Sequence, residues 1–188
     1  MENRVKQKKF VSLVLYLHNT QNEVVPFFQK VLPVFRDNFT NFEIVCVNDA
    51  CTDGTIGVLK EYLEENHCSE MVNIIHMSFF HGLESAMNAG RDLAIGDFIY
   101  EFDTAYVDYP SELIMEVYDK LLEGNDIVSA GTRDHVRMTS GFFYFCYNKT
   151  SRGRGKIGPE TFRIVSRRAI NRIKSIGQYI PYLSLIHI

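Results

Sequence analysis

Two spacings of apolar residues alternate along the first 130 residues of the chain. Short continuous apolar runs are separated by longer stretches in which apolar residues recur every three or four positions. The first spacing is typical of strands buried on both faces, and the second of amphipathic helices. Strands are therefore expected at residues 11–17, 42–47, 72–77, 98–102 and 126–130.

Helical spacing fills the stretches between these strands. Helices are expected at residues 22–39, 53–66, 83–95 and 110–123. Pro26 suits the first turn of the first helix, whereas Pro33 is expected to kink or break it. Thr52, or alternatively Thr55, is expected to cap the second helix. After residue 130 the pattern weakens, and residues 162–176 have spacing that fits either a helix or a strand.

The alternation of strands and helices predicts an α/β fold. A largely parallel sheet with right-handed crossovers and helices on both faces is the expected arrangement. Ligands bind beyond the carboxyl ends of the strands in such sheets. The polar residues that follow each strand are therefore the candidates for a site.

Composition changes this picture little. The chain has 188 residues, of which 46% are hydrophobic and 23% charged, as in an ordinary globular domain. It contains no apolar run of membrane-spanning length and no apolar segment of a signal peptide at its start. The four cysteines and six histidines follow no zinc or redox spacing, which disfavours a zinc hydrolase. A reduced, cytosolic setting is the simplest interpretation.

The charge is unevenly distributed along the chain. Residues 1–132 carry a net charge of −12, and the residues from Arg133 onward carry +9. This asymmetry suggests that a basic segment meets an anionic ligand, membrane surface or nucleic acid. Packing of the basic segment against the acidic body explains it equally well.

Four segments, in the same order as in a known family, then become informative. They are VSLVLYLHNTQNEV at 11–24, FEIVCVNDACTDGT at 42–55, HGLESAMNAGRDLAIGDFIYEFDT at 81–104 and DYPSELIMEVYDKLLEGNDIVSAGTR at 108–133. With these segments the chain resembles family 2 glycosyltransferases of the GT-A fold. The nearest branch includes dolichol-phosphate mannose synthase and the bactoprenol glucosyltransferases. The resemblance extends more weakly to residue 168.

The resemblance implies an enzyme. Its expected reaction is the inverting transfer of a sugar from a nucleoside-diphosphate sugar to a polyprenyl phosphate or a growing cell-envelope glycan. It also implies one domain over residues 1–188, with a nucleotide-sugar-binding half at 9–133 and an acceptor-side segment at 134–188. The abrupt apolar end of the sequence, PYLSLIHI, suggests that this segment is cut short or ends in an unpaired strand. The expected location is cytoplasmic, including the inner face of the membrane, and nucleic acid is not an expected partner.

Five residues match positions that hold the nucleotide sugar in this family. The resemblance implies that Asn19 lies beside the base and that Asp49, in the family's D-D-G-S-x-D-x-T block, contacts it. Gly82 and Asn88 match the G-x-x-x-A-x-N-x-G segment that lies along the nucleotide sugar. Asp103 matches the first aspartate of the metal-binding DxD motif, which implies a Mg²⁺ or Mn²⁺ cofactor.

The second aspartate of that motif is replaced by Ala105. One carboxylate is thereby lost from the metal shell. Diphosphate oxygens, water or Asp108 could complete the shell. There are two alternatives to a completed metal shell. The protein could bind the metal weakly, or it could be a catalytically degenerate module that binds a nucleotide sugar or a partner.

The acceptor side is expected to begin near the block GPETFRI at 158–164. It resembles a family block that ends in Phe-Arg-Leu and follows a catalytic aspartate. The nearest carboxylate here is Glu160, which is therefore the expected general base. Arg133 and Arg163 are expected to meet the phosphate of an anionic acceptor. The basic residues between 149 and 156 could join them or form a solvated loop.

Three further function classes are disfavoured by the residues themselves. Nucleotidyltransferases and NAD-dependent oxidoreductases would need a glycine-rich turn after the first strand, and this turn is His18-Asn19-Thr20. Nucleic-acid binding has no RNA-binding signature to support the basic segment.

Overall fold

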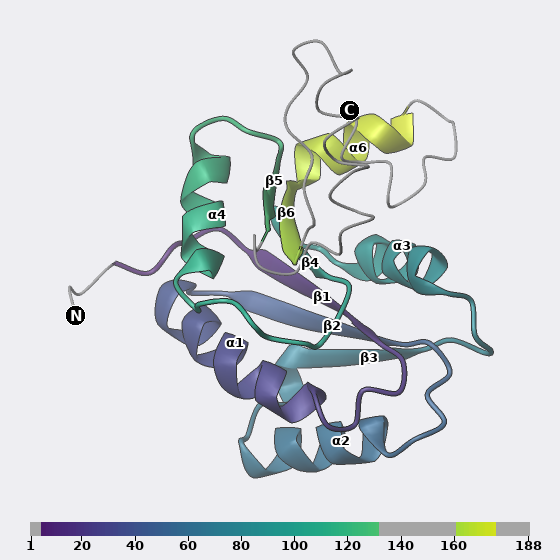
Figure 1. Ribbon diagram of the computed structural model, residues 1–188. Helices are drawn as coiled ribbons and strands as arrows, with labels where there is room; N and C mark the ends of the chain where they lie inside the picture. The colour runs from purple at the N-terminus through teal and green to yellow at the C-terminus, as the bar shows by residue number, and fades with distance from the viewer. Residues whose placement is uncertain (1–4, 132–160, 176–188) are drawn as a thin grey trace, which may run out of the picture.

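A computed structural model describes residues 5–131 and 161–175 of the chain (Figure 1). Its strands form one six-stranded sheet in the order β3-β2-β1-β4-β6-β5. The strands are β1 (Val11–Leu17), β2 (Phe42–Asn48), β3 (Val72–His76), β4 (Phe98–Phe102), β5 (Ile127–Ala130) and β6 (Phe162–Ser166). Strands β1 to β4 are parallel, and β6 is antiparallel to both of its neighbours. The expected α/β fold with a mostly parallel sheet is confirmed.

Helices cover both faces of the sheet (Figure 1). They are α1 (Val24–Asn38), α2 (Thr55–Glu65), α3 (Leu83–Leu93), α4 (Leu113–Leu122) and α6 (Arg167–Ser175), with a short 3₁₀ turn, η1 (Ser69–Met71), before β3. Helices α1, α2 and α4 pack on one face, and α3 and α6 on the other. No helix in the described ranges is both long enough and apolar enough to cross a membrane.

Strand β1 lies at the centre of the sheet and shows why the fold forms. Its odd-numbered residues, such as Leu13 and Leu15, point into the larger core beneath α1 and α2, while Val14 points into the smaller core beneath α3. All three are fully buried. A strand that is apolar on both sides needs a helical layer on each face, which right-handed βαβ connections supply.

Helix α1 corrects one expectation. Pro33 lies inside the continuous helix and does not break it. A proline in a helix removes the hydrogen bond to the carbonyl four residues earlier, here that of Gln29. Both residues are exposed, so water can replace the missing bond and the buried face of α1 is kept.

Strand β6 lies in the stretch 162–176, where the spacing of apolar residues fitted either a helix or a strand. It is inserted between β4 and β5, with Tyr100 opposite Ile164 and Val128 opposite the same residue. Because β6 separates them, the fourth and fifth strands are not neighbours. Helix α6 begins directly after β6, at Arg167.

Candidate functional site

Side chains tie together the turns that follow β1 and β2. The Asn19 side-chain oxygen accepts hydrogen bonds from the backbone N–H groups of Thr52, at 2.8 Å, and Asp53, at 3.3 Å. The Gln21 side-chain oxygen accepts one from the N–H of Gly54, at 3.0 Å. Asn19 itself has a positive φ of 53°, a backbone conformation that asparagine tolerates better than most residues. One asparagine thus holds two loops in register at the carboxyl edge of the sheet.

The start of α2 differs from the expected cap. The N-cap residue is Gly54, so neither Thr52 nor Thr55 caps the helix. The Asp53 carboxylate accepts hydrogen bonds from the Thr55 N–H, at 3.0 Å, and from the Thr55 hydroxyl, at 2.5 Å. These bonds satisfy a free amide of the first turn. Desolvation opposes ionisation of Asp53, but together the hydrogen bonds from Thr55 and Gln21 outweigh it and lower the pKa of this carboxyl.

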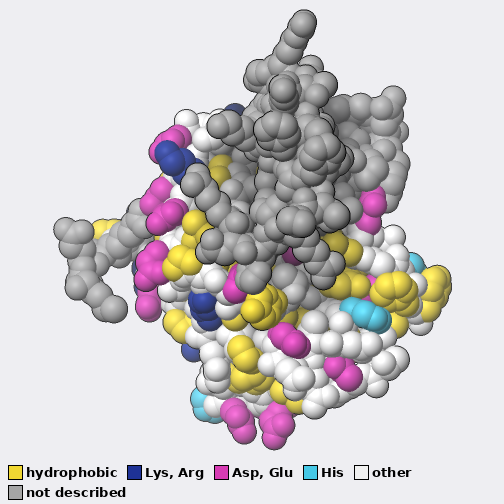
Figure 2. Space-filling view, viewed as in Figure 1, with side chains coloured by type: hydrophobic (Ala, Val, Ile, Leu, Met, Phe, Trp, Pro, Cys, Tyr) yellow, Lys and Arg dark blue, Asp and Glu magenta, His cyan; other side chains and the backbone are white. Residues whose placement is uncertain are grey.

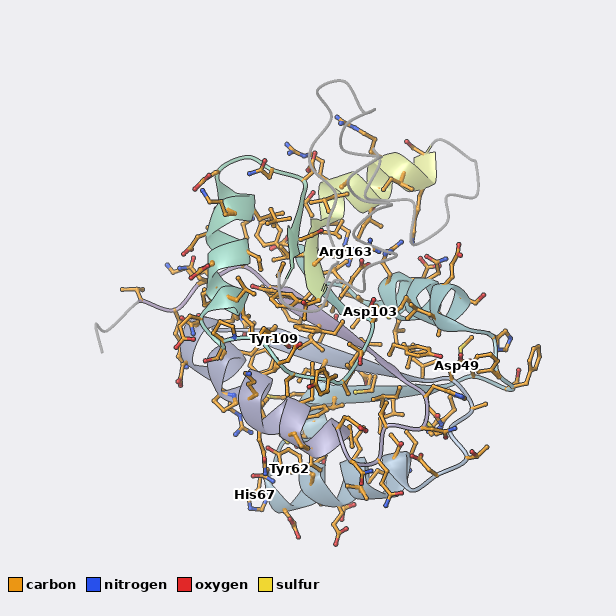
Figure 3. All side chains as sticks on the ribbon, viewed as in Figure 1. Asp49, Tyr62, His67, Asp103, Tyr109 and Arg163 are labelled. Atoms are coloured by element: carbon orange, nitrogen blue, oxygen red, sulfur yellow. The ribbon has the colours of Figure 1, made fainter. Side chains whose placement is uncertain are left out.

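Asp49 follows β2 and has no exposed surface. One carboxylate oxygen accepts a hydrogen bond from the His81 N–H at 2.8 Å. The other accepts bonds from the Gly82 N–H, at 2.8 Å, and from the Tyr16 hydroxyl, at 3.1 Å. Burial, and then the hydrogen bond with Asp49, raise the pKa of Tyr16 above its ordinary value. Asp49 therefore connects β1, β2 and the loop that leads to α3 (Figure 3).

Aromatic rings project from that loop. Phe79 and Phe80 are 64% and 57% exposed. The Phe80 ring packs on His18 with centroids 4.6 Å apart, and the Phe79 ring stacks on His81 at 3.9 Å. Figure 2 shows hydrophobic and histidine side chains together on this side of the molecule, where the loop between β3 and α3 emerges in Figure 1. The site thus has an exposed aromatic surface beside a buried carboxylate.

Three residues of the segment around α3 have distinct roles. Gly82 is the N-cap of the helix, with φ of 82°, a region that favours glycine. The Asn88 side-chain oxygen accepts a hydrogen bond from Arg91 at 3.2 Å. A Cβ on Gly90 would lie 2.5 Å from a methyl of Val14 and 2.7 Å from one of Val47. Gly90 therefore lets α3 approach the sheet closely.

Asp103 lies directly after β4 and is half-buried. Ala105 is fully buried and belongs to the larger hydrophobic core. Asp108 is exposed. Within residues 5–131 and 161–175, no three His, Cys, Asp or Glu side chains are grouped so that they could hold a metal ion. The residues in these ranges therefore do not form a complete metal site, and the part expected of Asp103 in such a site stays a prediction.

Arg163 is the acceptor-side residue that the structure describes, and its expected contact with an anionic acceptor stays a prediction. Its side chain is buried, and its Nε lies 2.6 Å from the Glu101 carboxylate. Arg91 of α3 contacts the other oxygen of the same carboxylate at 2.5 Å. Glu101 and Arg163 are opposite one another in the β4–β6 register, so the pairing fixes Arg163 inside the sheet. Figure 3 shows Arg163 above Asp103 on this side of the fold.

The remaining predicted site residues lie outside the described part of the chain. These are Glu160 and Arg133, with the basic residues between 149 and 156. Two contributors were missed by sequence reasoning. Tyr16 lies in an apolar strand, where nothing distinguishes its hydroxyl. Glu101 is a lone acid in the apolar run FIYEF, which was a usable signal of a buried ion pair.

This geometry can be compared with known proteins. A family model described as Glycosyl transferase family 2 matches residues 12–179. The chain belongs to glycosyl transferase family 2. An uncharacterised glycosyltransferase of Synechocystis is 32% identical over 176 residues, covering 89% of this chain and 54% of that protein. A bactoprenol glucosyl transferase of Shigella phage SfV is 30% identical over 177 residues, covering 89% and 55%. The chain spans about half the length of these relatives.

Solved structures of glycosyltransferases share the fold. A mannosyltransferase from Pyrobaculum calidifontis, in complex with GDP-Man and Mn²⁺, has a TM-score of 0.70 at 17% identity, covering 89% of this chain and 47% of that one. A glucosyl-3-phosphoglycerate synthase from Mycobacterium tuberculosis, with Mn²⁺, UDP and phosphoglyceric acid, has a TM-score of 0.67 at 14% identity, covering 86% and 57%. This family 2 chain therefore has the GT-A fold.

Proposed function

We propose that this family 2 glycosyltransferase binds a nucleoside-diphosphate sugar at the carboxyl ends of β1, β2 and β4. The observation that supports this most is the joining of three loops at one sheet edge by Asn19 and Asp49. Ligands of parallel α/β sheets bind at such edges. The solved relatives named above hold GDP-Man or UDP.

The proposed reaction is transfer of the sugar, with inversion, to a polyprenyl phosphate or a growing glycan. An oxygen of the acceptor attacks the anomeric carbon from the face opposite the nucleoside diphosphate. The bond from that carbon to the diphosphate breaks, and its electron pair leaves with the diphosphate. The bactoprenol glucosyl transferases among the relatives favour the polyprenyl phosphate, and hence action at the cytoplasmic face of a membrane.

The two acceptors place different demands on Glu160. A glycan hydroxyl must lose a proton during attack, which a carboxylate base can accept. A phosphate oxygen is already ionised near neutral pH, so no base is needed. We therefore expect Glu160→Gln to lower the transfer rate at least a hundredfold with a hydroxyl acceptor, and to have little effect with polyprenyl phosphate.

Divalent cations accompany the nucleotide in the solved relatives. Asp103 is the residue that would contribute a carboxylate to such an ion. Because the described residues do not complete the site, we assign no step of the transfer to a metal. The buried methyl of Ala105 favours the second candidate function, a catalytically degenerate module that binds a nucleotide sugar without transferring it.

A thermal-shift panel tests the binding proposal. UDP, GDP, CDP, dTDP and their sugar conjugates are each added with and without Mn²⁺ or Mg²⁺. At about 100 times its dissociation constant, a ligand should add roughly 2.7 kcal/mol of stability. Asp103→Asn tests the site, and Asp37→Asn is the control, since Asp37 is exposed in the last turn of α1, away from the carboxyl ends of the strands.

Transfer is then measured with the nucleotide sugar that binds. Labelled sugar should appear on polyprenyl phosphate in vesicles. Binding without transfer to either acceptor would support the degenerate module. A chain that binds none of the nucleotides would contradict both candidate functions.

A further inference from the structure

Exposed apolar side chains are sorted by type between the two ends of the sheet. In the described ranges, the exposed phenylalanine and tyrosine rings all lie in the loops that follow β3 and β4, at the carboxyl edge (Phe79, Phe80 and Tyr106). The exposed large aliphatic residues lie before β1, at or just after the end of α3, and at the end of α4 (Val5, Leu93, Ile95 and Leu122). Single exposed aliphatic residues are ordinary on a protein surface. The gathering of aromatic rings at one edge is therefore the unusual feature.

The rings after β3 are held in place by the protein itself. Phe79 and Phe80 are each more than half exposed, and each packs one side of its ring against a histidine. Nδ1 of His81 lies 2.6 Å from the Phe79 carbonyl, and the His81 N–H donates to Asp49. Hydrophobic and histidine side chains gather on this side of the molecule in Figure 2. Because the rings are already ordered, little side-chain entropy remains to be lost when a partner covers them.

The segment that carries these two rings has no formal charge. Residues 71–83, MVNIIHMSFFHGL, contain no Asp, Glu, Lys or Arg. Such a segment can enter the headgroup region of a bilayer without the desolvation of a charge. Acids do lie on the same edge, since Asp53 and Asp108 are exposed there. An anionic surface therefore offers these loops no attraction, and a zwitterionic lipid surface suits them better.

We propose that the carboxyl edge of the sheet contacts the headgroup region of a lipid bilayer through Phe79, Phe80 and Tyr106. Aromatic side chains are favoured at the boundary between membrane and water. Three rings on two loops are too few for a stable protein interface, which covers about 800 Å² on each partner. The choice of a bilayer rests on the proposed function, because a phosphate carried on a polyprenyl chain would have to reach this same edge from a membrane.

The chain contains no tryptophan, which allows a direct test. Phe79→Trp and Tyr106→Trp each introduce a single fluorophore at the edge. Ile95→Trp and Leu122→Trp are the matched controls, at exposed apolar positions away from it. Each variant carries an N-terminal His tag on a flexible linker of about 40 Gly/Ser residues, which spans roughly 35 Å. The tag binds phosphatidylcholine vesicles that contain a nickel-chelating lipid, so that even a weak contact of the rings becomes measurable.

The tether does not favour the expected result, because the chain enters β1 from the opposite, amino edge of the sheet. Vesicles with brominated acyl chains quench tryptophans that enter the lipid. Interfacial side chains reach about 5–10 Å into the boundary of headgroups and acyl chains, so the fluorescence of Phe79→Trp and Tyr106→Trp should fall at least about twofold relative to unbrominated vesicles. The fluorescence of Ile95→Trp and Leu122→Trp should stay unchanged. Equal quenching of the controls, or quenching of neither or only one of the edge variants, would overturn the proposal.

A second measurement, without vesicles, tests a protein partner. If the emission of Phe79→Trp shifts to the blue as the protein concentration rises, the rings bury against a second copy of the chain, and the bilayer contact is overturned. Neither experiment contains a nucleotide or an acceptor. A failure of the quenching test therefore leaves the nucleotide-binding proposal standing, and a failure of the thermal-shift panel leaves the quenching result to decide the membrane contact.

Discussion

The two halves of the sheet are held together in different ways. In the half built from β1, β2 and β3, side chains bind backbone amides of neighbouring loops at the carboxyl edge, as Asn19 and Asp49 do. In the half built from β4, β6 and β5, Glu101 binds two arginines inside the fold. The first kind of contact shapes a surface, and the second fixes a strand.

The separation of the partners in sequence explains this difference. The loops of the first half follow consecutive βα units, so Asn19 and Thr52 are only 33 positions apart. Arg163 lies 62 positions after Glu101 and returns in an antiparallel strand. A charged pair at matched register specifies that distant strand. The comparison predicts that removing one polar group lowers the free energy of unfolding more in the second half than in the first.

The largest effect is expected at Glu101. In Glu101→Ala, Arg91 and Arg163 keep their buried positions but lose the carboxylate that they share. Removing one partner of a buried ion pair costs about 3–5 kcal/mol, and urea unfolding measures it. Glu64→Ala, on the exposed side of α2, should change stability by less than about 0.5 kcal/mol. A loss below about 1 kcal/mol at Glu101 would show that water compensates the arginines.

A smaller loss is expected from Ala105→Asp, which restores the second acid of the DxD motif. The Ala105 side chain packs in the apolar core, so an aspartate there has to be desolvated or to displace its surroundings. We expect a loss of about 3 kcal/mol and no gain in Mn²⁺ affinity, measured by unfolding and by calorimetry with the ion alone. Tight Mn²⁺ binding by this variant would show that the site tolerates the second carboxylate. The control is Ala105→Ser, which has a similar volume and no charge.

The strands of the first half were predictable because each βα unit carries its own signal. Residues 98–102 were predicted and found as β4, since a continuous apolar run is buried whichever neighbours it has. Strand β6 had no such independent signal. Its run FRIVS contains Arg163, and only pairing with β4 and β5 makes an arginine acceptable there. The residues that depend on a distant partner are the ones that single-sequence patterns miss.

The candidate site shows the same limit. The position of Asp49 at a strand end followed from the order of strands and helices. Its partners did not, because two of them are the backbone amides of His81 and Gly82, which every sequence offers equally. The ion pair of Arg163 with Glu101 could not be predicted for a related reason, since the charge of Arg163 is visible in the sequence and its burial is not.

A packing change tests the close contact between α3 and the first half. In Gly90→Ala, the new methyl meets Val14 and Val47, whose β-branched side chains are stiff and buried. We expect a loss of about 1–3 kcal/mol in urea unfolding. Gly57→Ala in α2 is the matched control, because a Cβ there meets nothing within 4 Å, and it should be neutral or stabilising by up to about 1 kcal/mol. Equal effects of the two changes would contradict the close approach.

The smallest effect is expected at the outer end of the second half, where Asp126 meets β6. The Ser166 hydroxyl donates to its carboxylate at 2.6 Å, and Arg168 lies 2.9 Å away. The Ser166 bond, and then Arg168, lower the pKa of Asp126 in the folded state. A lowered folded pKa gives stability that is present above the unfolded value, about 3.9, and is lost as the pH falls through the folded one. Asp126→Asn should therefore cost under about 1 kcal/mol at pH 7, since Arg168 is exposed, and less at about pH 2. A cost of the same size at both pH values would mean that the loss comes from altered packing and not from the charge.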